Sequence, residues 1–199
     1  MADESNVTPA TAPADRLAAE AARATSAGKL PPVHLWNPPF CGDLDMRIRR
    51  DGTWFYLGTP IGRPALVRLF STILKREGER YFLVTPVEKV GITVEDAPFV
   101  AVDVEVEGSG AAQLLVFETN VGDRVTAGEG HPIRVTRDPE TGEPAPYVHI
   151  RAGLEALIDR KTFYRLAELG VHGRHDGADW FGLWSGGLFW PMIPSAEMV

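Results

Sequence analysis

The densest group of chemically capable side chains follows a proline pair near the start of the chain. Cys41, Asp43 and Asp45 occupy alternate positions in the string CGDLDMR. Alternate residues of an extended strand point to the same face, so the two carboxylates can bind a divalent cation or a donor-rich ligand together. A metal would need further carboxylates from distant parts of the chain. The competing interpretation is the start of a strand, in which Asp45 pairs with Arg47 or Arg49.

The single cysteine offers a second kind of chemistry. Cys41 can act as a nucleophile if a histidine, such as His34 or His149, draws off its proton. No spacing in the sequence brings a histidine to it, and a single cysteine is more commonly a small packed apolar side chain. A hydrolase that uses Asp43 and Asp45 with a metal, or Cys41 with a histidine, is therefore the alternative hypothesis and not the leading one.

A glycine-containing loop, GTPIGRP, runs from Gly58 to Pro64 into a predicted helix. Such a loop can aim backbone N–H groups and the positive end of the helix at an anion, with Arg63 as a bidentate donor. The loop lacks the Lys and the Ser or Thr of a phosphate-binding loop, so it does not indicate a Walker-type nucleotide site. Otherwise Gly62 serves only the turn and Arg63 pairs with an acidic neighbour.

The remaining candidates for ligand contact are scattered along the chain. Adjacent residues of a strand face opposite sides, so only one of Glu88 and Lys89 can line a given pocket. His149 lies in the strand-like string YVHIR. The expected polar contacts are Asp43, Asp45, Arg47, Arg63, Glu88, Lys89 and His149, with Trp54 and Trp184 as walls; no metal and no cofactor is expected.

An aromatic hairpin near the C-terminus suggests a third hypothesis. Five aromatic residues between Trp180 and Trp190 flank the turn at Ser185, Gly186 and Gly187. Alternation sends some of these rings outward, where exposed aromatic faces can grip a partner. A protein-interaction module of this kind predicts an exposed apolar patch of several hundred Å². The more usual role of such rings is in a core.

A weak internal repeat supplies the elements that position these residues. Residues 45–92 and 147–192 both show the pattern of a strand, a turn, a strand, a helix and a hairpin. In the strands the repeat aligns Arg49 with Arg151. In the helices it aligns Arg63, Leu66, Arg68 and Leu69 with Arg160, Phe163, Arg165 and Leu166.

Each predicted helix has its own start signal. Pro64 occupies the first helical position of one helix, and Asp159 is an N-cap for the other. The segments between the two copies alternate apolar and polar residues, which is strand periodicity. We expect an α+β protein of two related small units, each a curved antiparallel sheet packed on one helix. The expected organisation is a disordered tail and short helix over residues 1–30, one unit over 31–97 and a second over 98–199.

Composition excludes some classes of protein. The 199 residues carry 20 Lys and Arg against 27 Asp and Glu, a net charge of −7, which gives no general attraction to nucleic acid or anionic lipid. One cysteine suits a reducing compartment. No stretch approaches the roughly 20 apolar residues that span a bilayer, and the acidic N-terminus lacks the features of a secretory signal. We expect a cytoplasmic protein.

Long strings of the chain resemble a known family. LWNPPFCGDLDMRIRRDGTWFYLGTPIGRPALVRLF and YFLVTPVEKVGITVEDAPF, followed by FETNVGDRV, HPIRV and PYVHIRAGLEALIDRKTFYRLAEL, are similar to the bacterial family of unknown function DUF1285. The resemblance runs from about Leu30 to Met192. It implies a two-domain duplication, a C-terminal part superficially like pleckstrin-homology folds, a ligand site in the cleft between the domains and a link to signalling. No enzymatic activity comes with it.

The leading hypothesis is a non-enzymatic cytoplasmic binding protein. The repeat, the resemblance and the lack of a complete catalytic constellation favour a small-ligand or partner site between the two units. The partner is an unknown small molecule or protein, and the sequence argues against nucleic acid and against a membrane. It leaves the ligand, the oligomeric state and the pathway open.

Overall fold

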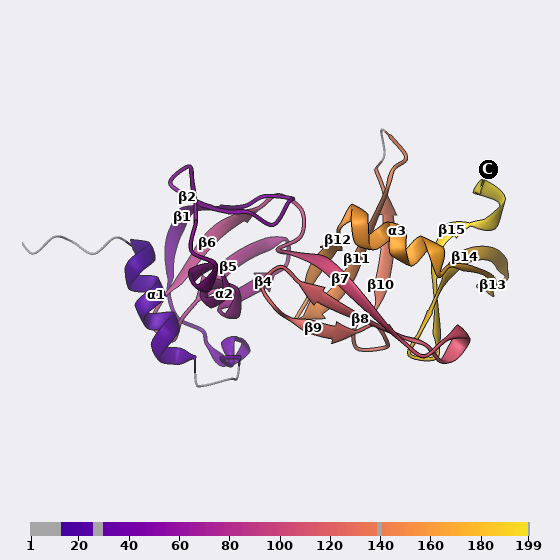
Figure 1. Ribbon diagram of the computed structural model, residues 1–199. Coiled ribbons are helices and arrows are strands. Elements are labelled where there is room, and N and C mark those ends of the chain that lie inside the picture. The colour runs from indigo at the N-terminus through magenta and orange to yellow at the C-terminus, as the bar shows by residue number, and fades with distance from the viewer. Residues whose placement is uncertain (1–12, 26–29, 139–140, 199) are drawn as a thin grey trace, which may run out of the picture.

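The computed structural model describes residues 13–25, 30–138 and 141–198. Two domains follow one another along the long axis of the molecule (Figure 1). Each domain holds a six-stranded sheet, and a separate three-stranded sheet ends the chain. The segment expected to be a disordered tail lies, over residues 1–12, outside the described residues, and so do residues 26–29 at the expected end of the first helix.

The N-terminal sheet has the strand order β3-β2-β1-β6-β5-β4. Its central pair, β1 and β6, is parallel and the other pairs are antiparallel. The expected antiparallel sheet is therefore a mixed one, antiparallel except for this central pair. The chain passes from β1 through a helix and a hairpin before β6, and a crossover of this length allows parallel pairing. The elements are α1 (Pro13–Ala24), η1 (Val33–Leu35), β1 (Phe40–Ile48), β2 (Trp54–Tyr56), β3 (Thr59–Pro60), α2 (Pro64–Thr72), β4 (Leu74–Glu77), β5 (Arg80–Val84) and β6 (Lys89–Val94).

The C-terminal sheet repeats this mixed design with the order β10-β11-β12-β7-β8-β9. Here β12 and β7 form the parallel pair. The last three strands form an antiparallel sheet that contacts β10 through β15. The elements are β7 (Phe99–Glu107), η2 (Gly110–Ala112), β8 (Leu114–Thr119), β9 (Arg124–Thr126), β10 (Ile133–Arg137), β11 (Pro144–Arg151), β12 (Leu154–Ile158), α3 (Arg160–Glu168), β13 (Val171–His175), β14 (Ala178–Ser185), β15 (Leu188–Pro194) and η3 (Ser195–Glu197).

The prediction of two related α+β units is confirmed. The order β1, β2, α2, β4, β5 in one half corresponds to β11, β12, α3, β13, β14 in the other. The halves differ in how the last strands pair. In the N-terminal half, β4 and β5 follow α2 and join the same six-stranded sheet as β1 and β2. In the C-terminal half, β13 and β14 follow α3 and belong to the separate three-stranded sheet.

The two central helices begin differently. At α2 the N-cap residue Arg63 makes no side-chain cap bond, and Pro64 holds the first helical position. At α3 the Asp159 carboxylate accepts a hydrogen bond of 2.7 Å from the backbone N–H of Thr162. This bond satisfies one of the N–H groups that every helix leaves free at its start.

One apolar core cluster runs through both domains. In the N-terminal domain Trp54 stacks on Phe70, with ring centroids 6.3 Å apart. Phe99 and Leu166 continue the cluster in the C-terminal domain, where both are fully buried. Helix α1 packs on α2 and buries Ala14, Leu17 and Ala21. Among the described residues, no helix is both long enough and apolar enough to cross a membrane.

Candidate functional site

A carboxylate in the segment between β6 and β7 links the two domains. The Tyr147 hydroxyl donates a hydrogen bond of 2.8 Å to Asp96 Oδ1. Asp96 Oδ2 lies 3.1 Å from Arg50 Nε of the β1–β2 turn. Burial, followed by the hydrogen bond to Asp96, raises the pKa of Tyr147 to about 12. Both oxygens of Asp96 are therefore engaged, one by each domain.

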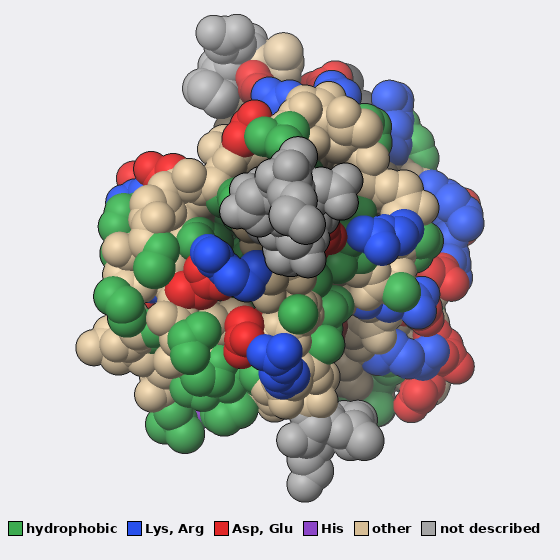
Figure 2. Space-filling model, turned by 90° about the vertical axis from the view of Figure 1, so that its left-hand side faces the viewer, with side chains coloured by type: hydrophobic (Ala, Val, Ile, Leu, Met, Phe, Trp, Pro, Cys, Tyr) green, Lys and Arg blue, Asp and Glu red, His purple; other side chains and the backbone are tan. Residues whose placement is uncertain are grey.

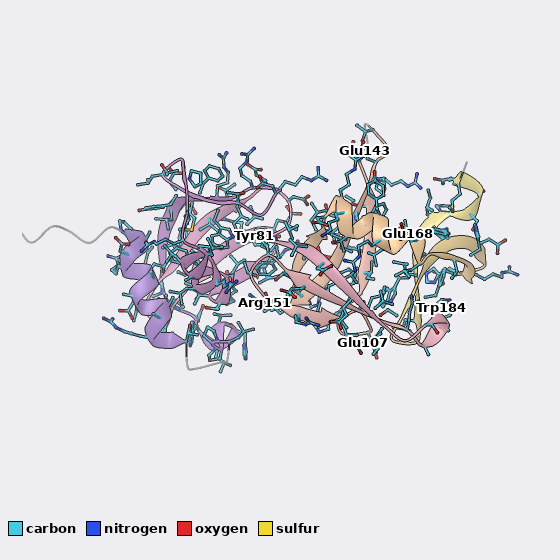
Figure 3. All side chains as sticks on the ribbon, viewed as in Figure 1. Tyr81, Glu107, Glu143, Arg151, Glu168 and Trp184 are labelled. Carbon is cyan, nitrogen blue, oxygen red and sulfur yellow. The ribbon has the colours of Figure 1, made fainter. Side chains whose placement is uncertain are left out.

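Arg151 makes the second link between the domains. Its guanidinium donates to the backbone oxygen of Ser71 over 2.9 Å, forms an ion pair with Asp123 and lies 4.8 Å from the centroid of the Phe99 ring. Figure 3 shows Arg151 and Tyr81 in the middle of the molecule, where the two domains meet. These contacts join the C-terminal sheet to the end of α2 in the N-terminal domain.

A groove lies where Arg50 of the N-terminal domain meets the C-terminal domain. This groove has a volume of about 410 Å³. Arg50 comes from the N-terminal domain, and the other lining residues come from the start of α3 and from β11 and β12. Ligand pockets occur preferentially at domain interfaces, with volumes of about 300–1,000 Å³. The lining residues are Arg50, Glu143, Pro144, Ala145, Pro146, Leu157, Ile158, Asp159, Arg160, Phe163 and Tyr164.

Four charged side chains line the groove, and two of them are already engaged. Arg50 pairs with Asp96, and the Asp159 carboxylate caps α3. Arg160 donates from Nε to the Tyr164 hydroxyl over 3.0 Å. That hydrogen bond, and more weakly the Glu143 carboxylate, raises the pKa of Arg160 above its ordinary value. Arg160 and Tyr164 therefore present a fixed cation and a hydroxyl on the first turns of the helix.

A second pocket, of about 340 Å³, lies beside the glycine-containing loop of the N-terminal domain. Arg63, Leu66 and Phe70 line it, together with residues 59–62 of the loop. Ala14 and Asp15 of α1 form part of the same wall. The Asp15 carboxylate opposes the binding of an anion here, although the loop and Arg63 are positioned as the sequence predicted.

The ionic candidates from the sequence engage neighbours within the N-terminal part of the chain. Asp43 Oδ1 pairs with Arg80 at 2.7 Å, and Arg47 lies 3.5 Å from Glu95. Asp45 is exposed on the same strand. The string CGDLDMR therefore lies in a strand, as the competing interpretation expected, but the expected pairing of Asp45 with Arg47 or Arg49 is not found among the described residues.

Glu88 and Lys89 occupy different surroundings, Glu88 just before β6 and Lys89 at the first position of that strand. Glu88 is 6% exposed and its carboxylate pairs with Arg16 of α1 at 3.0 Å. Lys89 pairs with Glu77 at 3.0 Å and lies over the Phe82 ring. Both side chains thus stabilise the N-terminal domain.

The aromatic candidates and His149 are far from one another. Trp54 is 1% exposed, so its ring belongs to the core and cannot form the wall of an open pocket. Trp184 lies at the opposite end of the C-terminal domain from Arg151 (Figure 3). His149 accepts at Nε2 from the N–H of Gly153 over 3.1 Å, and its Nδ1 lies 3.0 Å from the Gly130 oxygen.

The nine predicted site residues therefore do not converge. None of them lines the groove between the domains, and Arg63 alone lines one of the two pockets described above. Sequence reasoning missed Arg50, Arg160 and Tyr164. The repeat carried a signal for one of them, because it aligns Arg160 with Arg63.

Neither hydrolase constellation is assembled by the part of the chain that the structure describes. No group of three or more His, Cys, Asp or Glu side chains there could hold a metal ion. Cys41 is exposed, and its Sγ lies 3.5 Å from the Pro39 oxygen. Asp103, a carboxylate from a distant part of the chain, is held by Arg165, and the hydrogen bond from Arg165 lowers the pKa of Asp103.

The aromatic hairpin largely packs on itself. Trp184 and Phe189 make an edge contact at 5.4 Å, and the indole of Trp190 donates to the Ser185 oxygen. Gly173 and Gly182 leave the space that the Phe189 ring fills, because a Cβ at either glycine would clash with that ring. All five rings of the hairpin are half-buried.

The face at the N-terminal end mixes charges of both signs. Figure 2 shows Lys and Arg side chains interleaved with Asp and Glu on this face. Such an arrangement is unlike the continuous basic patch of a nucleic-acid-binding surface.

Comparisons with known proteins agree with the architecture. The domain of unknown function DUF1285, N-terminal domain, matches residues 31–97, and the DUF1285 C-terminal domain matches residues 98–192. A crystal structure of a DUF1285 family protein from Silicibacter pomeroyi DSS-3 is 68% identical, with a TM-score of 0.83 over 92% of this chain and 97% of that chain. One from Shewanella baltica OS155 is 30% identical, with a TM-score of 0.51 over 63% of this chain and 91% of that chain. No curated protein matches the chain.

Proposed function

The chain belongs to the DUF1285 family, and from this premise we propose that it is a non-enzymatic binding protein whose small-molecule site is the groove between the two domains. The observation that carries the proposal is the composition of that groove, to which both family domains contribute. A ligand held there contacts Arg50 of one domain and Arg160 and Tyr164 of the other.

The groove supplies binding groups on a rigid frame. Arg160 and Tyr164 lie on one face of α3, one turn apart, and are hydrogen-bonded to each other. Arg50 is oriented by Asp96, which Tyr147 holds in turn. Side chains that are already ordered lose little conformational entropy when a ligand binds. Pro144, Pro146, Leu157 and Phe163 give the groove apolar walls.

We also propose a role in signalling, which the same geometry supports. A ligand between the domains stabilises one arrangement of the two sheets, because it binds residues from both. A cytoplasmic sensor that reports a small molecule to a protein partner has this design. The function does not require a catalytic group in the groove.

A thermal-shift screen tests the proposal directly. The purified full chain is heated with short carboxylates, inorganic phosphate, nucleotides and divalent metals, because a ligand that binds the native state raises the apparent Tm. We expect at least one organic ligand to raise the Tm, and Arg160→Ala to abolish that shift.

Arg174→Ala provides the matched control. Arg174 is an exposed arginine of β13, in the three-stranded sheet, and does not line the groove. Its Nε lies 4.0 Å from the carboxylate of Asp179. This variant should keep the shift. A panel without any effect, or a shift that survives in Arg160→Ala, would overturn the proposal.

A further inference from the structure

A chamber of about 240 Å³ adjoins the groove and is lined on one side by Phe163 and Ala167 of α3. Its walls are apolar, and Arg137 supplies the one polar side chain among the residues that line it. The main wall residues are Val135, Ala167, Phe181, Met192, Ile193 and Met198. A cavity with such walls offers water few hydrogen bonds and favours an apolar occupant.

The chamber and the groove are neighbours. Pro144 and Phe163 line both of them. Phe163 is half-buried, so its ring is a partition that a side-chain rotation can open. A single ligand can thus reach from the polar groups at the start of α3 into the apolar space beside the helix.

The internal repeat relates this space to the other domain. The alignment of Leu66 with Phe163 and of Leu69 with Leu166 places Phe70 opposite Ala167 in the next position. In the N-terminal domain Phe70 is fully buried and stacks on Trp54. In the C-terminal domain the small side chain of Ala167 faces the chamber instead. The second copy therefore has a small side chain at the position where the first copy has an aromatic ring, and the pockets beside the two helices differ in shape for that reason.

The charges at the mouth select the polar end of the ligand. Two arginines line the groove, and Arg50 is paired with Asp96. Among the described residues no carboxylate lies at ion-pairing distance from the other one, Arg160, and the Tyr164 hydroxyl beside it donates or accepts a hydrogen bond. Glu143 and Asp159 line the same groove, and both disfavour a second negative charge. A carboxylate with one negative charge fits this mouth better than a phosphate monoester with two.

We infer that the groove takes an amphipathic monocarboxylate, whose head binds Arg160 and Tyr164 and whose unbranched apolar tail occupies the chamber beside Ala167. This inference rests on the proposed function, since it specifies the ligand class for the same groove. It adds the tail site, which the proposed function does not need.

The length of the ligand's alkyl tail provides the test. Binding of butanoate and dodecanoate to the full chain is measured by isothermal titration calorimetry, with dodecanoate below its micelle concentration. We expect dodecanoate to bind at least about tenfold more tightly, because each buried methylene adds to the affinity. Dodecyl phosphate and dodecanol, which change only the head, should bind more weakly than dodecanoate.

Ala167→Phe fills the chamber with the side chain of the first copy. It should bring the affinity for dodecanoate down to that for butanoate while leaving butanoate binding unchanged. Ala167→Leu is the milder variant, in case the larger ring prevents folding, and should lose part of the gain. Ala178→Phe, at an exposed alanine of β14 outside the chamber lining, should retain wild-type affinities.

The outcomes separate the two ideas. If butanoate binds and dodecanoate gains nothing, or if both Ala167 variants leave dodecanoate binding intact, the tail site is wrong while the proposed function stands. If dodecyl phosphate equals dodecanoate, the assignment of the head is wrong. If no carboxylate binds, this inference falls, and the thermal-shift screen decides the proposed function separately.

Discussion

The start of α2 and the start of α3 occupy equivalent places in the two domains, yet they are built differently. In the N-terminal domain α1 covers part of the pocket beside Arg63, and Phe70 fills the space beneath α2. In the C-terminal domain Asp159 caps the helix, and a groove and a chamber remain open around Phe163 and beside α3. The pocket at the first helix is thus partly covered by α1 and bounded by a large ring, whereas the groove and the chamber at the second helix are bounded by the smaller Ala167 and by Phe163.

The largest expected effect is a difference in stability between phenylalanine variants of the two central helices, α2 and α3. Phe70→Ala removes a fully buried ring and should lower the free energy of unfolding by about 3–5 kcal/mol in urea denaturation. Phe163→Ala, at the aligned helix and half-buried, should cost clearly less. Equal losses for the two variants would contradict the comparison.

The next effect concerns the contact that joins the two copies. Arg151→Ala removes the hydrogen bond to Ser71 and the ion pair with Asp123, and should lower the free energy of unfolding by about 1.5–3 kcal/mol. The control is Arg124→Ala, whose guanidinium pairs with Glu105 on an exposed surface. That change should leave the free energy of unfolding close to that of the wild-type protein, because solvent screens an exposed ion pair. Equal decreases in the free energy of unfolding for the two variants would show that Arg151 stabilises the protein no more than an exposed arginine does.

The two helix starts themselves give a smaller effect. Asp159→Ala removes the side-chain cap of α3 and should lower the free energy of unfolding by about 1 kcal/mol. Arg63→Ala removes no cap bond at α2 and should change it by less than about 0.5 kcal/mol. Thermal unfolding of the two variants side by side measures the difference, and the reverse order would refute it.

The last effect is confined to alkaline solution. The pKa of Tyr147 is raised from 10.0 to about 12, because burial and then the Asp96 carboxylate disfavour the tyrosinate. The neutral hydroxyl therefore stabilises the fold below pH 10, and this stabilisation is lost as the pH rises from 10 to about 12. Tyr147→Phe should flatten that part of the stability profile. A decline as steep as that of the wild-type protein would exclude Tyr147 as its source.

The fold could be predicted further than the site. Helix starts at Pro64 and Asp159, and the order of elements in both copies, follow from local signals that a single strand or helix carries. The direction of strand pairing does not. Alternation in a strand is the same whether its neighbour is parallel or antiparallel, so the pairs β1–β6 and β7–β12 were not visible in the sequence.

The candidate site depended on distances that the sequence does not contain. Asp43 and Asp45 formed the densest polar string, but Asp43 pairs with Arg80, 37 positions further along the chain, and Asp45 faces solvent. Arg50 gave no signal, because it lies in a turn and meets the groove only through the docking of the second domain. Arg160 carried only its alignment with Arg63 as a signal, and the carboxylate of Asp159 before it is occupied by the helix that it caps.

The parallel pairing of β7 with β12 also determines the order in which the two edges of β7 can pair while the chain is being synthesised. β7 can pair with β8 as soon as that hairpin leaves the ribosome, but its other edge waits until residues 154–158 are made. During that interval the apolar first residues of β7, Phe99 to Ala101, have unpaired backbone groups on one edge that are open to other chains. We expect the nascent C-terminal domain to need a chaperone, or a slow rate of translation, at the point where β7 has emerged and β12 has not.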